Sequence, residues 1–100
     1  MRILVIGDVN GRAGRQILRQ RLPRLTAERA IDFTVANVEN AADGFGVTPE
    51  LTEGLLADGL DCLTSGNHIW DKQEIMEYIP GQPRLLRPLN YPERQPGAGI

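Results

Sequence analysis

The chain has 100 residues, 41% of them hydrophobic, and a formal net charge of −2. This length predicts one domain, residues 1–100, near the lower end of the usual size range and with a modest core. The slightly negative charge excludes binding to nucleic acid or to membranes through bulk positive charge.

The first predicted element is a strand over residues 3–6, which read ILVI and are followed by Gly7 and Asp8. A continuous run of β-branched and leucine residues is typical of a central parallel strand that is buried on both faces. Because this run is short and ends in an acid, it is neither a signal peptide nor a membrane span. We therefore expect a cytoplasmic protein that makes no membrane contact.

A helix is predicted next, over residues 15–22, after a loop at residues 10–14. Apolar residues recur here at helical spacing, and we expect Pro23 to break or restart the helix. Six arginines but only one acid, Glu28, lie between Arg12 and Arg29. A solvated helix face is the favoured interpretation of these arginines, and contact with RNA or an anionic ligand is the alternative.

The second strand is predicted over residues 33–38, and residues 40–47 form a glycine-containing loop flexible enough to fold over a site. Thr48 then has the character of a helix N-cap, with Pro49 as the first helical residue and an acid in the first turn. We expect this helix to end at Gly59 as its C-cap.

The third strand is predicted over residues 60–64 and contains the single cysteine, Cys62, which we expect to be buried in a reducing compartment. A polar loop and a short helix follow, with Ile75, Met76 and Ile79 on one side of the helix. Residues 84–87 are a candidate fourth strand, and residues 88–99 are rich in proline and glycine.

Strands that alternate with helices predict an α/β fold built from parallel βαβ units. A sheet of three or four strands leaves an open edge and an uncovered face, which reduce stability or favour association. We therefore expect this chain to be the N-terminal part of a larger domain, and association of identical chains is another way to cover the edge.

Polar side chains follow the end of each predicted strand. Asp8 follows the first strand, Glu39 and Asn40 follow the second, and Asn67 and His68 follow the third. The carboxyl ends of parallel strands meet at one edge of the sheet, where ligands bind. We therefore expect these side chains to line one crevice.

Two carboxylates in one crevice repel each other unless a cation lies between them. A divalent metal removes this conflict, and a bridging carboxylate can hold two ions about 3.5–4 Å apart. Mixed oxygen and nitrogen donors suit Mn, Fe or Zn better than Ca. The sequence thus predicts a metal site with Asp8, Glu39, Asn40 and Asn67 as candidate ligands.

Two metals at such a site favour the hydrolysis of a phosphoester, because they stabilise both the attacking and the leaving oxygen. His68 is the candidate general acid for the leaving alkoxide, and Asp71 is a candidate to orient it. Asn10 is a candidate contact to the metal ligands or to the substrate phosphate.

The polar clusters resemble the signatures of the YmdB-type bacterial metallophosphoesterases. They are residues 7–15 (GDVNGRAGR), 37–46 (NVENAADGFG) and 64–71 (TSGNHIWD), and residues 87–92 (RPLNYP) resemble a fourth signature. The resemblance implies the N-terminal half of a calcineurin-like α/β sandwich with a dinuclear site. Where that superfamily often has a histidine in its first motif, this chain has Asn10, as the YmdB type does.

The resemblance also implies a phosphodiesterase with two divalent or trivalent metal ions, Fe or Mn before Zn, and with cyclic nucleotides such as cAMP as substrates. By this analogy Asp8 holds one metal, Glu39 bridges both, and Asn67 holds the other. His68 becomes the acid for the leaving group, and Asn40 belongs to the same site.

This chain has a single histidine, His68. Members of the family that it resembles continue further and supply later histidine ligands, so we expect the functional site to belong to the larger domain. Two noncatalytic alternatives remain open. One is a nucleotide-binding module of Rossmann type, although the glycine spacing after the first strand is wrong for it. The other is an RNA-binding regulatory module that uses the basic helix.

Overall fold

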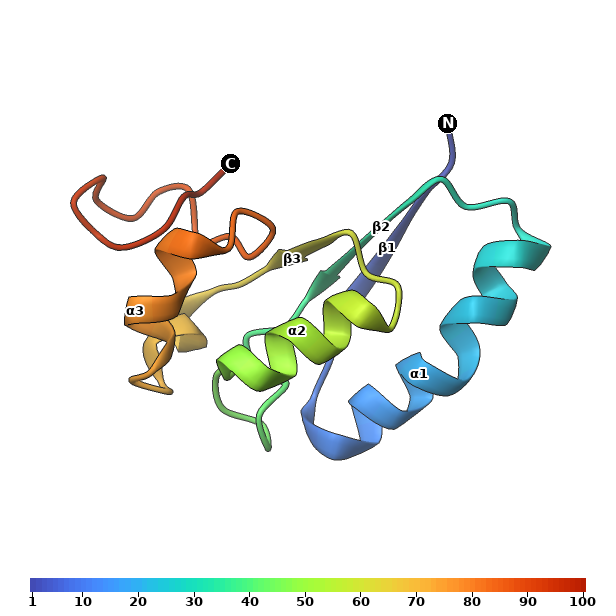
Figure 1. The fold of residues 1–100 in the computed structure, drawn as a ribbon, viewed down its shortest axis with the longest axis horizontal. Helices are drawn as coiled ribbons and strands as arrows, with labels where there is room; N and C mark the ends of the chain where they lie inside the picture. Colours follow the sequence, from blue (N-terminus) through green and yellow to red (C-terminus); the bar gives the residue numbers. More distant parts are fainter.

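The computed structural model describes residues 1–100 as a three-stranded parallel sheet with helical crossovers (Figure 1). The strands are β1 (Ile3–Asp8), β2 (Phe33–Asn37) and β3 (Cys62–Thr64), in the order β1-β2-β3. Helix α1 (Gly11–Glu28) connects the first pair of strands and α2 (Pro49–Ala57) connects the second. The predicted α/β fold of parallel βαβ units is confirmed.

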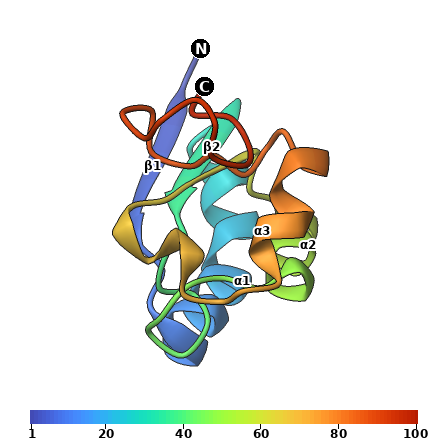
Figure 2. The same cartoon turned by 90° about the vertical axis from the view of Figure 1, so that its left-hand side faces the viewer.

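Both crossover helices lie on the same side of the sheet (Figure 2). As a result, the prediction that the first strand is central and buried on both faces is wrong. Strand β1 lies at the sheet edge, and Ile3 and Val5 point away from the helices with exposed fractions of 57% and 72%. Leu4 and Ile6 point the other way and pack against the core.

Helix α1 begins at Gly11, earlier than predicted, and continues through Pro23 to Glu28. Proline in a helix removes one backbone hydrogen bond. Here Pro23 is exposed, while Leu18 and Leu22 on the opposite face are buried. Burial of that apolar face holds the two halves of the helix in line, so the expected break does not occur.

The predicted start of α2 is confirmed, because the Thr48 hydroxyl accepts a hydrogen bond from the Leu51 backbone N–H at 3.1 Å. Pro49 is the first helical residue, as predicted. The C-cap is Asp58 rather than Gly59, which follows it with a φ of +117°. Strand bounds also shift slightly, since β2 ends at Asn37 and β3 begins only at Cys62.

Residues after β3 form the short helix α3 (Ile75–Tyr78) between two 3₁₀ turns, Asn67–Trp70 and Ile79–Gly81. The three apolar residues do not share one side of this segment, because Ile75 and Ile79 are buried and Met76 is exposed.

The candidate fourth strand is only a single parallel bridge, between Leu63 and Leu85. The ladder stops after the Leu86 backbone N–H donates to the Leu63 carbonyl at 2.8 Å, because the next residue to face β3 is Pro88, which has no N–H to donate.

Fourteen buried residues form one core between the sheet and the helices, among them Leu55, Leu60 and Leu63. Cys62 is half-buried, less than predicted. Burial raises the pKa of its thiol and the nearby Arg84 lowers it in part, so the thiol stays protonated near neutral pH. None of the helices is both long and apolar enough to cross a membrane.

Candidate metal centre at the carboxyl edge of the sheet

Hydrogen bonds join the three strand ends at one edge of the sheet. The Asn40 side-chain amide donates to both carboxylate oxygens of Asp8, each at 3.1 Å. The carbonyl oxygen of the same amide contacts Nδ1 of His68. The His68 backbone N–H in turn donates to Oε2 of Glu39 at 3.2 Å. The structure therefore brings together Asp8, Glu39, Asn40 and His68, as their positions after parallel strands predict.

The Glu39 side chain is fixed from two sides, by hydrogen bonds with Asn37 and by close packing on Gly66. The Asn37 side-chain amide donates to Oε1 of Glu39 at 3.0 Å, and Oδ1 of Asn37 accepts the Glu39 backbone N–H at 3.1 Å. On the other side, the carboxylate lies directly against Gly66, where an added Cβ would be 2.8 Å from Cδ of Glu39. Sequence reasoning missed both Asn37 and Gly66 as supports, although the amide two residues before the carboxylate was a signal.

The remaining predicted site residues lie at the margin of this network. Asn67 is exposed at the start of its 3₁₀ turn and makes no side-chain hydrogen bond. The Asn10 side chain lies near the 40–47 loop, because an added Cβ at Gly44 would be 3.6 Å from its Oδ1.

Asp71 contacts His68 only through the backbone, by a hydrogen bond from its N–H to the His68 carbonyl at 3.0 Å. The residue that orients the His68 ring in this structure is therefore Asn40, and not Asp71.

The loop at residues 40–47 folds over the site. Two of its backbone turns depend on positive φ angles, 90° at Gly44 and 74° at Gly46. Between them Phe45 is exposed, and its ring centroid lies 6.0 Å from that of His68 with the ring planes inclined by 44°. An exposed aromatic side chain beside the imidazole is a feature that the sequence analysis did not single out.

The donor chemistry of this edge fits a divalent metal as part of a ligand set. Carboxylate, amide and imidazole groups converge there, and Asp8 and Asn67 are exposed enough to reach an ion. However, no group of three His, Cys, Asp or Glu side chains is placed to hold an ion without further help. Amide oxygens or additional ligands must therefore complete the coordination.

Replacing Gly66 with alanine is expected to destabilise the protein by about 1–3 kcal/mol, because its Cβ would overlap the Glu39 carboxylate. The measurement is the free energy of unfolding in urea. Gly54→Ala is the matched control, since nothing lies within 4 Å of its added Cβ in the middle of α2. That control should be neutral or slightly stabilising. Equal stability of the two variants would contradict the close packing of Glu39 on Gly66.

The sequence profile of a family described as YmdB-like protein matches residues 4–100. The whole chain is 47% identical to a protein of Bacillus subtilis (strain 168) named 2′,3′-cyclic-nucleotide 2′-phosphodiesterase, and it covers 38% of that relative.

Two solved structures share the fold. A hypothetical protein from Thermus thermophilus has a TM-score of 0.89 and 37% identity, over 99% of this chain and 38% of that one. A protein described as a novel phosphatase, from Mycoplasma pneumoniae, has a TM-score of 0.90 and 31% identity, over 97% of this chain and 36% of that one. The chain thus spans well under half the length of the proteins it matches.

Proposed function

Since the chain belongs to the YmdB-like family, we propose that it forms the N-terminal part of a metal-dependent phosphodiesterase that acts on cyclic nucleotides. The observation that carries this proposal is the hydrogen-bonded series Asp8, Asn40, His68 and Glu39, which joins all three strand ends. The name of the Bacillus subtilis relative favours a 2′,3′-cyclic nucleotide within this class.

Asp8, Glu39, Asn40 and Asn67 would hold the metal ions, together with ligands from the rest of the domain. Mn or Fe suits the mixture of oxygen and nitrogen donors, and Zn is the next candidate. When bound, such ions would supply Lewis-acid chemistry, which polarises a phosphoryl group and lowers the pKa of a water molecule that serves as nucleophile. Asp8 and Glu39 supply the negative charge that makes this edge selective for cations.

His68 would donate a proton to the leaving oxygen of the substrate. The two Asp8 oxygens accept from the Asn40 amide nitrogen, so its carbonyl oxygen must face the imidazole. This carbonyl can only accept, which places a hydrogen on Nδ1 of His68. In the imidazolium form Nε2 also carries a proton, and transfer of that proton to the leaving oxygen would return the ring to the neutral form with its hydrogen on Nδ1. Asn40 would therefore position His68 as the general acid.

A noncatalytic binding module is less well supported, because nucleotide binding alone gives no role to an imidazole that the Asn40 amide holds in one orientation. If the chain were only a binding module, its binding of nucleotides would not depend on a metal.

The proposal is tested by hydrolysis of 2′,3′-cAMP, 3′,5′-cAMP and bis(p-nitrophenyl) phosphate by the full-length protein. We expect turnover that requires Mn²⁺ or Fe²⁺, stops with EDTA and returns when the metal is added back. We expect 2′,3′-cAMP to be the better of the two cyclic nucleotides. Turnover that is unaffected by EDTA would contradict a metal-dependent mechanism.

A further inference from the structure

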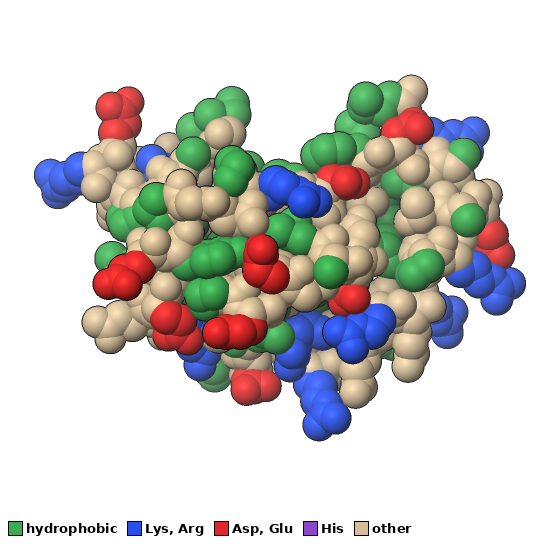
Figure 3. Space-filling model, in the orientation of Figure 1, with side chains coloured by type: hydrophobic (Ala, Val, Ile, Leu, Met, Phe, Trp, Pro, Cys, Tyr) green, Lys and Arg blue, Asp and Glu red, His purple; other side chains and the backbone are tan.

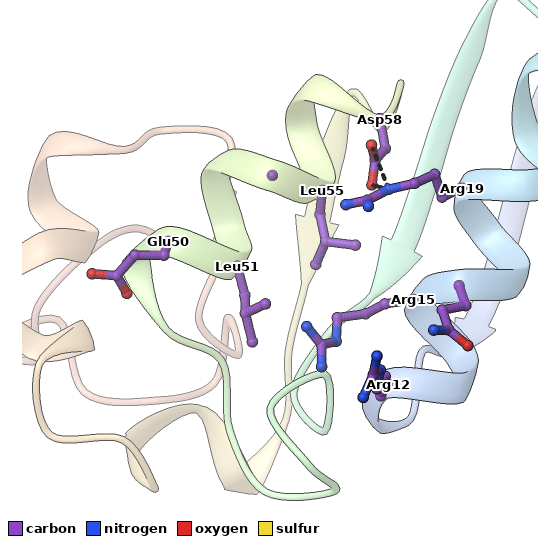
Figure 4. Close-up of a pocket in the computed structure, with 9 residues that line it drawn as sticks. Arg12, Arg15, Arg19, Glu50, Leu51, Leu55 and Asp58 are labelled. Carbon is purple, nitrogen blue, oxygen red and sulfur yellow. Dashed lines mark hydrogen bonds and ion pairs between the residues drawn. The ribbon is translucent and has the colours of Figure 1, made fainter.

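A groove of about 310 Å³ lies between the two crossover helices, outside the site described above (Figure 4). Arg12, Arg15 and Arg19 line it from α1, and Leu51, Leu55 and Asp58 line it from the region of α2. The three arginines are spaced at i, i+3 and i+7, so they share one face of α1 over about 10 Å of its length. This side of α1 therefore presents a row of guanidinium groups to a hollow.

Two of the three guanidinium groups have no acidic partner. Arg19 forms an ion pair with Asp58 at 3.3 Å. The other ion pair of the structure, Arg24 with Glu28, lies elsewhere on α1. Arg12 has none, and Arg15 donates only to the backbone carbonyl of Gly11, at 3.4 Å.

The remaining acid of the groove, Glu50, points away from these arginines in Figure 4. In Figure 3, basic side chains gather over the N-terminal half of α1, whereas acidic side chains gather toward α2 and α3. The groove is therefore locally positive although the chain as a whole is not.

The end of the groove that Arg12 and Arg15 line is next to the candidate metal centre. Helix α1 starts directly after the loop that follows Asp8, and the Gly11 backbone N–H donates to the Asn40 carbonyl at 2.9 Å. Arg15 folds back along the helix toward Gly11. A ligand that enters the site from this side would pass Arg12 and Arg15 first.

We infer that this groove binds the phosphodiester backbone of an RNA strand whose 3′ end reaches the metal centre. The inference rests on the proposed function. A 2′,3′-cyclic phosphate requires a ribose, and a mononucleotide of this type carries a single phosphate, which the metal centre already uses. Further unpaired cations beside the site thus match a substrate with additional phosphates. Because the groove has no aromatic lining, it binds backbone without reading sequence.

The test is binding of a 5′-fluorescein-labelled decauridylate that ends in a 2′,3′-cyclic phosphate, followed by fluorescence anisotropy at several salt concentrations. The test variant is Arg12→Gln/Arg15→Gln. The matched control is Arg21→Gln/Arg29→Gln, which removes the same charge from exposed positions on and just after α1, outside the groove. The slope of log K against log salt is negative, and loss of two phosphate contacts should make it shallower by about 1.4. Binding should also weaken about tenfold or more. The control should bind like the wild type.

Equal binding by the test variant and the wild type would overturn the inference, and so would an equal loss in the control, since bulk charge would then explain the binding. Arg12→Lys/Arg15→Lys should keep most of the affinity, because it keeps the charge. Anisotropy in the presence of EDTA separates this inference from the proposed function, because metal-dependent hydrolysis does not occur there. The difference between the test variant and the control should persist in EDTA, so binding can be judged even if the protein proves not to be a hydrolase.

Discussion

Glu39→Gln is expected to lower metal-dependent hydrolysis by about three orders of magnitude. The change keeps the shape of the side chain but removes the charge that would hold the metals. It also places a donor where only acceptors fit. Oε1 of Glu39 accepts from the Asn37 amide and Oε2 accepts from the His68 backbone N–H. Either orientation of the glutamine amide sets one N–H group against another.

The Asn37 side chain cannot easily turn over to relieve this conflict, because its Oδ1 already accepts the Glu39 backbone N–H. We therefore expect a loss of stability of about 1–3 kcal/mol as well. Initial rates with saturating Mn²⁺ measure the first effect, and urea unfolding measures the second. Glu74→Gln is the control, since Glu74 is exposed and makes no ion pair or side-chain hydrogen bond. Activity of the Glu39 variant within tenfold of the wild type would exclude this residue as a metal ligand.

His68→Gln is expected to lower the hydrolysis of 2′,3′-cAMP by about 10²–10⁴-fold, the usual contribution of a general acid. The ribose alkoxide that leaves in this reaction needs a proton. The p-nitrophenolate leaving group of bis(p-nitrophenyl) phosphate does not. The measurement compares the fold loss in hydrolysis of 2′,3′-cAMP with the fold loss for bis(p-nitrophenyl) phosphate, on one preparation of the variant. We expect the loss for the cyclic nucleotide to be much larger.

Asp71→Asn provides the comparison for this prediction. Asp71 reaches His68 only through a backbone hydrogen bond, so this variant should behave like the wild type with both substrates. If His68→Gln slowed both substrates equally, the imidazole would be holding a metal or the loop, and a role as proton donor would be wrong.

The convergence of the site residues could be predicted from the sequence because it depends on a general rule. Strands that run in parallel deliver their carboxyl ends to one edge, so Asp8, Glu39 and His68 had to be neighbours once the strands were identified. The start of α2 was predictable for a different reason. Its cap is a contact between Thr48 and Leu51, three residues apart, and depends on local geometry alone.

Features set by distant contacts could not be predicted in this way. Strand β1 looks like a central strand by composition, but its place at the sheet edge follows from both helices packing on the same side. Pro23 remains helical because buried leucines on the opposite face of α1 hold it there. The pairing of His68 with Asn40 instead of Asp71 joins two loops 28 residues apart, and only the three-dimensional arrangement selects it.

Electron paramagnetic resonance of Mn²⁺ bound to the full-length protein tests the central claim most directly, which is that these three strand ends form a dinuclear metal centre. We expect a spin-coupled signal from a pair of ions in the wild type. Glu39→Gln should lose this signal, and Glu74→Gln should keep it. A wild-type protein that binds no Mn²⁺, or a Glu39→Gln variant with an unchanged coupled signal, would contradict the account.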